Sequence, residues 1–135
     1  MPAKDRYHDA VKRALLKAGW RVEDEQFTIT VGERNLWVDL VASKDNPSLV
    51  ILVEVKELAD VDSAIEALAN AIGKFVLYST ALHLVQLSWP LYLAVTIASY
   101  NGILSQTIGR EVRQKMQIPL IVFDQMREEI VQWIP

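Results

Sequence analysis

The chain has 135 residues, of which 51% are hydrophobic, and its formal charge is −3. This length is typical of one domain, residues 1–135, and the small acidic charge creates no overall attraction to nucleic acid or to an anionic membrane. The absence of cysteine excludes disulfides, thiolate nucleophiles and zinc–thiolate sites. No apolar signal region or membrane-spanning segment stands out, so we expect a cytoplasmic protein that does not enter a membrane.

Basic residues are concentrated in two segments. The first segment contains Lys4, Arg6, Lys12, Arg13, Lys17 and Arg21, and the second contains Arg110, Arg113 and Lys115. Either cluster could make a local contact with DNA. The more frequent explanation is the solvated face of a helix, and both interpretations stay open at this point.

The first half of the chain alternates between helical and extended patterns. Apolar residues recur at three- and four-residue spacing over 7–18, which predicts an amphipathic helix that ends at Gly19. Residues 26–31 and 36–42 alternate in polarity and are separated by a short turn, which predicts a hairpin. Residues 49–55 form an almost continuous run of Val, Ile and Leu, typical of a strand that is buried on both faces.

The second half continues with a long apolar helix over about 60–82, which we expect to be buried on nearly all sides. A strand at 91–97, a more polar helix at 103–117 and a closing hairpin of 120–123 with 129–134 follow. The order is helix, three strands, helix, strand, helix, two strands. It predicts an α/β or α+β fold with a mixed central sheet flanked by helices.

Three charged residues interrupt the two central strands. Glu54 and Lys56 end a strand that is otherwise apolar, and because strand side chains alternate, both point the same way. Asp39 lies on the adjoining strand. Two carboxylates on neighbouring strands can hold Mg²⁺ or Mn²⁺ for phosphodiester hydrolysis, with Lys56 orienting water or stabilising phosphoryl charge. The alternative is a polar strand end beside a hairpin-pairing aspartate.

Other residues could assist such a site. Asp9 on the first helix could complete the metal shell. The long helix carries a line of polar residues four apart: Glu66, Asn70, Lys74 and Tyr78. Of these, Lys74 and Tyr78 could contact a phosphate. His8 and His83 are expected to be surface or packing residues rather than ligands.

Several segments resemble the XisH-like family, the fdxN-element excision controlling factors. The matching segments are YHDAVKRALLKAGW, LWVDL, VILVEVK, ALANAIGKFVLYSTAL, LYLAV and EEIVQWI. The resemblance covers nearly the whole chain in order. It implies a cyanobacterial role in the programmed excision of a DNA element during heterocyst development, with a separate recombinase and a small XisI-like partner.

The resemblance also implies a restriction-endonuclease-like fold of the PD-(D/E)xK superfamily. Asp39 then matches the metal-binding aspartate, Glu54 and Lys56 match the (D/E)xK pair, and Asp9 matches the acidic position of the first helix. Two positions depart from the pattern: Asp9 stands where Glu is usual, and Lys74 stands where Gln usually precedes the tyrosine by four residues.

Two functional hypotheses follow. The first is a nuclease-fold accessory factor in DNA rearrangement that binds Mg²⁺ or Mn²⁺ at Asp39 and Glu54 and, if active, hydrolyses DNA. The alternative is a catalytically inert interaction protein that acts by binding an XisI-like partner. A third hypothesis is a homodimer whose two sites face one duplex, since nuclease-fold domains of this size often pair.

Overall fold

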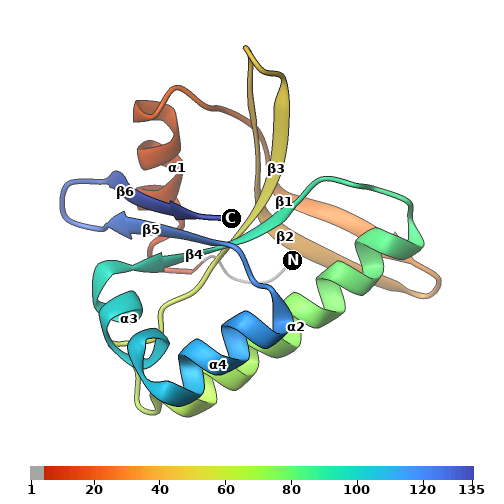
Figure 1. Cartoon of the computed structure of the whole chain (residues 1–135). Coiled ribbons are helices and arrows are strands. Elements are labelled where there is room, and N and C mark those ends of the chain that lie inside the picture. Colours follow the sequence, from red (N-terminus) through yellow and green to blue (C-terminus); the bar gives the residue numbers. More distant parts are fainter. Residues whose placement is uncertain (1–4) are drawn as a thin grey trace.

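The computed structural model describes residues 5–135, and its central feature is one six-stranded sheet with helices on both faces (Figure 1). The strands are β1 (Arg21–Val31), β2 (Arg34–Lys44), β3 (Leu49–Val55), β4 (Leu91–Thr96), β5 (Leu120–Asp124) and β6 (Glu129–Ile134). The helices are α1 (His8–Lys17), α2 (Ala64–Leu84), α3 (Ile97–Asn101), the 3₁₀ helix η1 (Ile103–Ser105) and α4 (Thr107–Met116).

The strands lie in the sheet in their order along the chain. The pairs β1–β2, β2–β3 and β5–β6 are antiparallel, whereas β3–β4 and β4–β5 are parallel. Each parallel pair needs a crossover, and α2 provides the first while α3, η1 and α4 provide the second. The predicted mixed sheet with flanking helices is therefore confirmed.

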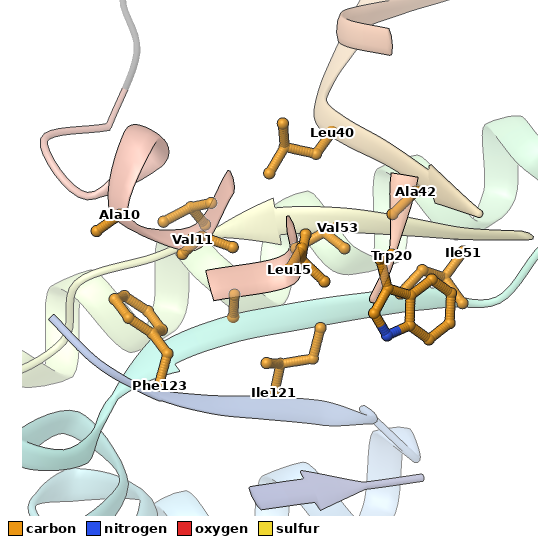
Figure 2. Close-up of a cluster of buried hydrophobic side chains, with 12 residues drawn as sticks. Ala10, Val11, Leu15, Trp20, Leu40, Ala42, Ile51, Val53, Ile121 and Phe123 are labelled. Atoms are coloured by element: carbon orange, nitrogen blue, oxygen red, sulfur yellow. The ribbon is translucent and has the colours of Figure 1, made fainter. Parts of the chain in front are cut away.

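One face of the sheet is covered by α1. Val11 and Leu15 are fully buried there, as the three- and four-residue spacing of the helix requires. Figure 2 shows both side chains among the residues of the central strands, including Val53 and Ile121. At the edge of this cluster, the rings of Trp20 and Trp133 stack with centroids 5.4 Å apart.

The opposite face is covered by α2 and the segment around α4. Leu68 and Ala71 of α2 pack there with Leu93, Val95 and Leu120. Because Ala94 and Ile121 belong to the α1 cluster, successive residues of β4 and β5 point to opposite faces. Burial on both faces explains why these strands are apolar at nearly every position.

Several predicted boundaries were wrong, and for three of them the structure shows where the prediction failed. β1 begins at Arg21 rather than at residue 26, because a register shift between Val22 and Asp24 lets the polar segment continue the pairing with β2. The strand predicted over 91–97 ends at Thr96, whose hydroxyl accepts from the Ser99 N–H and caps α3. The helix predicted over 103–117 is divided into η1 and α4.

The expectation that α2 is buried on nearly all sides was also wrong. Ile65, Leu77 and Leu84 are 52%, 60% and 61% exposed, because the sheet covers only one side of this helix. Among residues 5–135, no helix combines the length and the apolar character needed to cross a bilayer.

Candidate metal centre

The ladder of backbone hydrogen bonds between β2 and β3 is interrupted at Asp39 and Glu54, and we call this the opened ladder. Its last regular pair is Leu40 with Val53, which places the two acids opposite each other. The Val55 N–H donates to Asp39 Oδ2 at 2.7 Å, and the Asp39 N–H donates to Glu54 Oε1 at 3.3 Å. Each carboxyl group therefore accepts from a backbone N–H of the other strand where the ladder ends, so both are held in place.

Both acids are almost completely removed from solvent, with Asp39 8% and Glu54 5% exposed. Burial, and secondly the negative charge of Asp39, raise the pKa of Glu54 from 4.5 to about 8, although Lys74 and Lys56 partly offset this effect. Glu54 therefore keeps its proton at neutral pH. A divalent cation beside both groups would supply the positive charge that the proton now provides.

Two lysines lie next to the acids. Lys74 Nζ is 3.7 Å from Glu54 Oε2, and Lys56 Nζ donates to Asn70 Oδ1 at 3.4 Å. Burial and the nearby charge of Lys74 lower the pKa of Lys56. Tyr78, one turn beyond Lys74 on α2, is buried, and its pKa is raised by burial and by the charge of Glu54. Three residues of the polar line on α2 therefore face the site of the two acids: Asn70, Lys74 and Tyr78.

An open cleft of about 410 Å³ lies beside Lys56 and Asn70. Its lining includes Asp5, Arg6, Lys56, Glu57, Asp60 and Asn70. The pKa of Asp5 is raised by burial and by the charge of Asp39, so Asp5 belongs to the same charged neighbourhood. A hollow of about 470 Å³ near the end of α2 is lined by residues from Leu82 to Ser88, and His83 is its one titratable side chain. Of these two hollows, the cleft at Lys56 is the one lined by carboxylates together with a lysine and an arginine.

His8 and Glu25 are residues of this region that the sequence did not single out as ligands. His8 is 1% exposed, and its Nδ1 lies 3.9 Å from Asp39 Oδ1. Its Nε2 is hydrogen-bonded to Glu25 Oε1 at 2.8 Å, while Lys12 Nζ donates to Glu25 Oε2 at 2.8 Å. The hydrogen bonds from Lys12 and His8 lower the pKa of Glu25 to about 2.

The structure brings most of the predicted residues together but places Asp9 differently. Asp39, Glu54, Lys56, Lys74 and Tyr78 form one group around the opened ladder. Asp9 is exposed on α1, where its carboxylate lies with ligand atoms of His8 and Glu25, all within 4.8 Å of one another. His8, rather than Asp9, is the residue of α1 that reaches toward Asp39.

The basic cluster of the first segment is largely engaged within the protein. Lys12 is bonded to Glu25, Arg13 Nε donates to Glu128 at 2.8 Å, and Lys17 donates to the Arg127 carbonyl at 2.7 Å. Arg6 and Arg21 pair with Asp60 and Asp45. These contacts favour a surface role for the cluster, while Lys4 lies outside the described residues.

The donor set suits a hard or intermediate divalent cation. Two buried carboxyl groups face each other, and beside one of them lies a buried imidazole nitrogen that has no hydrogen-bond partner within residues 5–135. Oxygen ligands suit Mg²⁺ and Mn²⁺, and an added nitrogen suits the later transition metals. Asp39 and Glu54 are the carboxyl groups that would hold such an ion.

Fold and site together define an α/β protein with paired carboxyl groups at the point where two central strands separate. The profile of the family described as XisH protein matches residues 1–131. The chain belongs to the XisH family.

Two solved structures are close relatives. A crystal structure of an XisH family protein from Nostoc punctiforme PCC 73102 is 34% identical, covers 97% of this chain and 100% of its own, and has a TM-score of 0.88. A crystal structure of an fdxN element excision controlling factor protein from Anabaena variabilis is 36% identical, covers 98% and 100%, and has a TM-score of 0.90. No curated protein matches the chain.

Proposed function

We propose that this chain is a nuclease-type accessory factor in the controlled excision of a DNA element, and that it hydrolyses DNA with Mg²⁺ or Mn²⁺ at Asp39 and Glu54. The observation that carries the proposal is the pair of buried carboxyl groups opposite each other across the opened β2–β3 ladder, with Lys56 beside an open cleft. Membership of the XisH family and likeness to an fdxN element excision controlling factor support the role in excision.

The roles of the residues follow from their positions. A bound divalent cation polarises a phosphoryl oxygen and lowers the pKa of a bound water. Asp39 and Glu54 would hold the cation, and the backbone N–H groups that donate to them fix the positions of both carboxyl groups. Lys56 lines the cleft and is oriented by Asn70, so its amine is placed to position the attacking water or to stabilise charge on the phosphate.

Plasmid cleavage tests this proposal. In Mg²⁺ or Mn²⁺ we expect the wild-type protein to nick supercoiled DNA, and Lys56→Met to lose at least about 100-fold in rate because the charge at the phosphate is removed. Lys56→Met should still bind the metal, since Lys56 is not a ligand. Arg34→Met, which removes an exposed positive charge from the first residue of β2 and outside both basic clusters, is the control and should cut normally.

The proposal of hydrolysis fails if wild-type protein leaves supercoiled, linear and branched DNA uncut in both metals. A Lys56→Met protein that cuts as fast as wild type would instead contradict the role given to Lys56.

A second candidate function is an inert interaction protein that binds an XisI-like partner. Two observations favour it. Lys74 places an ammonium group 3.7 Å from Glu54, where it competes with a metal ion, and Leu77 and Leu84 expose apolar surface on α2. An Asp39→Ala, Glu54→Ala double variant that keeps its fold and its partner but loses function would contradict this candidate.

Lys74→Gln is expected to strengthen Mn²⁺ binding. A like-charge repulsion of about 1 kcal/mol near the site corresponds to about fivefold in affinity. The measurement is calorimetry at a pH above the pKa of Glu54, so that protonation of Glu54 does not change between the variants. Unchanged or weaker binding would show that Lys74 does not oppose the metal.

A further inference from the structure

His8 is the feature that the proposed hydrolysis leaves unexplained. It is one of two residues within 5–135 that have a buried side-chain polar atom without a hydrogen-bond partner, and the other is Gln26. Gln26 adopts a left-handed backbone (φ 55°) and lies between Glu25 and Phe27, which pair with Leu40 and Val38, so its register position is opposite Asp39. The two unpartnered atoms therefore belong to residues of α1 and β1, both of which lie next to Asp39.

The ring orientation of His8 follows from its contact with Glu25. The Glu25 carboxylate is paired with Lys12 through Oε2 at 2.8 Å, and a carboxylate has no proton to donate, so its Oε1 accepts from His8 Nε2. The proton of a neutral His8 ring is therefore on Nε2. Nδ1 then presents a lone pair toward Asp39 Oδ1 at 3.9 Å and has no hydrogen-bond partner among residues 5–135.

At 3.9 Å the two atoms are too far apart for a direct hydrogen bond, and a positive charge between two buried acceptors would stabilise both. A metal ion about 2.1 Å from a nitrogen and about 2.1 Å from an oxygen spans up to about 4.2 Å, which accommodates the observed 3.9 Å. The contact of Nε2 with Glu25 repeats an arrangement common in metal sites, in which a carboxylate fixes the imidazole that binds the ion.

We propose that Nδ1 of His8 is a further ligand of the divalent cation at Asp39, which makes the centre a mixed nitrogen–oxygen site that prefers Mn²⁺ or Co²⁺ to Mg²⁺. The inference rests on the proposed metal site at Asp39 and Glu54 but does not require DNA cleavage. Glu25 and Lys12 act as positioning residues, because they hold the ring and do not touch the ion.

The side-chain cluster of His8, Asp9 and Glu25 is the competing location for an ion. Lys12 already supplies a positive charge there by donating to Glu25 at 2.8 Å. An ion in that cluster would also displace the hydrogen bond between His8 Nε2 and Glu25. The position beside Nδ1 requires neither contact to break.

The test uses Co²⁺ and Mn²⁺ with two substitutions. Each of them places a polar atom at one of the two ring-nitrogen positions of His8 and leaves the other position empty. The amide nitrogen of His8→Gln reaches the position of Nε2 and keeps the bond to Glu25, but the group at Nδ1 is lost. The amide oxygen of His8→Asn occupies the position of Nδ1, but the bond to Glu25 is lost. His83→Gln removes the second, exposed histidine of the chain and is the matched control.

We expect His8→Gln to bind Co²⁺ at least about tenfold more weakly than wild type and to change the visible absorption of bound Co²⁺. His8→Asn should retain more affinity than His8→Gln, because an oxygen stands at the ligand position. His83→Gln should match wild type in both measurements. The ratio of Mn²⁺ to Mg²⁺ affinity should fall in His8→Gln, since oxygen ligands then dominate.

A second measurement uses only wild-type protein and covers the case in which the variants do not fold. Zn²⁺ added to ¹⁵N-labelled protein should shift the resonance of His8 Nδ1 and leave that of His83 unchanged. The inference is overturned if His8→Gln binds Co²⁺ as tightly as wild type, or if the protein binds metal while His8 Nδ1 does not respond. Binding through the side-chain cluster with Asp9 would instead be abolished by Asp9→Asn.

The two proposals fail in different ways. Wild-type protein that binds Co²⁺ through His8 but cuts no DNA would leave the ligand role intact and contradict hydrolysis. Protein that cuts DNA while His8→Gln binds metal normally would contradict the ligand role alone. Absence of any divalent-metal binding would overturn both.

Discussion

Asp39→Ala is expected to abolish Mn²⁺ binding and also to lower the free energy of unfolding by about 1–3 kcal/mol. The loss of stability has a specific cause, because the Val55 N–H donates to Asp39 Oδ2 inside the protein and would be left without an acceptor. Asp39→Asn keeps an oxygen for this N–H but removes the charge. We therefore expect it to lose the metal at nearly normal stability, as measured by calorimetry and chemical denaturation.

Asp39→Asn should also lower the pKa of Glu54. The charge of Asp39 is the second cause, after burial, of the raised pKa of Glu54, so this pKa should fall in the variant while remaining above 4.5. Carbon-detected NMR titration of the Glu54 carboxyl group measures it. Asp62→Asn, at an exposed position before α2, is the control. Normal Mn²⁺ binding by Asp39→Asn would show that the ion is held elsewhere.

The facing acids could be predicted because strand geometry has a strict period. Glu54 and Lys56 follow an apolar strand, and Asp39 lies on the strand before it, so a short antiparallel connection brings them together. The register observed, with Leu40 opposite Val53, completes this pairing. The opening of the ladder was not predictable, since it depends on side chains that replace backbone hydrogen bonds.

The role of His8 was harder to recognise, although one signal was present. His8 precedes Val11 by three residues and Leu15 by seven, so it belongs to the buried side of α1, whereas Asp9 is turned about 100° away. Glu25 gave no signal, because the predicted strand began after it. The register shift after Val22 and the left-handed Gln26 determine where Glu25 lies, and neither follows from alternation of polarity.

The exposure of α2 shows a different limit. Its apolar composition predicted burial on nearly all sides, but composition records what a helix can bury and not how much surface is available to cover it. One sheet face covers Leu68 and Ala71, while Leu77 and Leu84 remain exposed. The polar line on this helix was the better guide, since Asn70 and Lys74 contact Lys56 and Glu54.

Glu54→Gln is expected to make the stability of the protein less dependent on pH. The pKa of Glu54 is about 8 in the folded protein and near 4.5 when the chain is unfolded. Between these values the folded state binds more protons than the unfolded state, so the stability of wild type falls as pH rises from 4.5 to 8. Glutamine is neutral throughout and still offers an oxygen to the Asp39 N–H.

The free energy of unfolding of Glu54→Gln should therefore rise relative to that of wild type as pH increases. This difference should level off above about pH 8. Each pKa unit corresponds to about 1.4 kcal/mol, so denaturation curves should separate by a few kcal/mol across this range. Glu33→Gln removes a charge from an exposed turn and should run parallel to wild type. Equal pH dependence of Glu54→Gln and wild type would mean that Glu54 is not held protonated by the fold.

Bound Mn²⁺ should reverse this difference in stability between wild type and Glu54→Gln. Saturating Mn²⁺ stabilises a protein that binds it only when folded, and binding requires the ionised form of Glu54. At alkaline pH we therefore expect Mn²⁺ to raise the melting temperature of wild type but not that of Glu54→Gln. The buried carboxyl group that weakens the metal-free fold would then be the group that binds the ion, which links the cost of burying Glu54 directly to the proposed function.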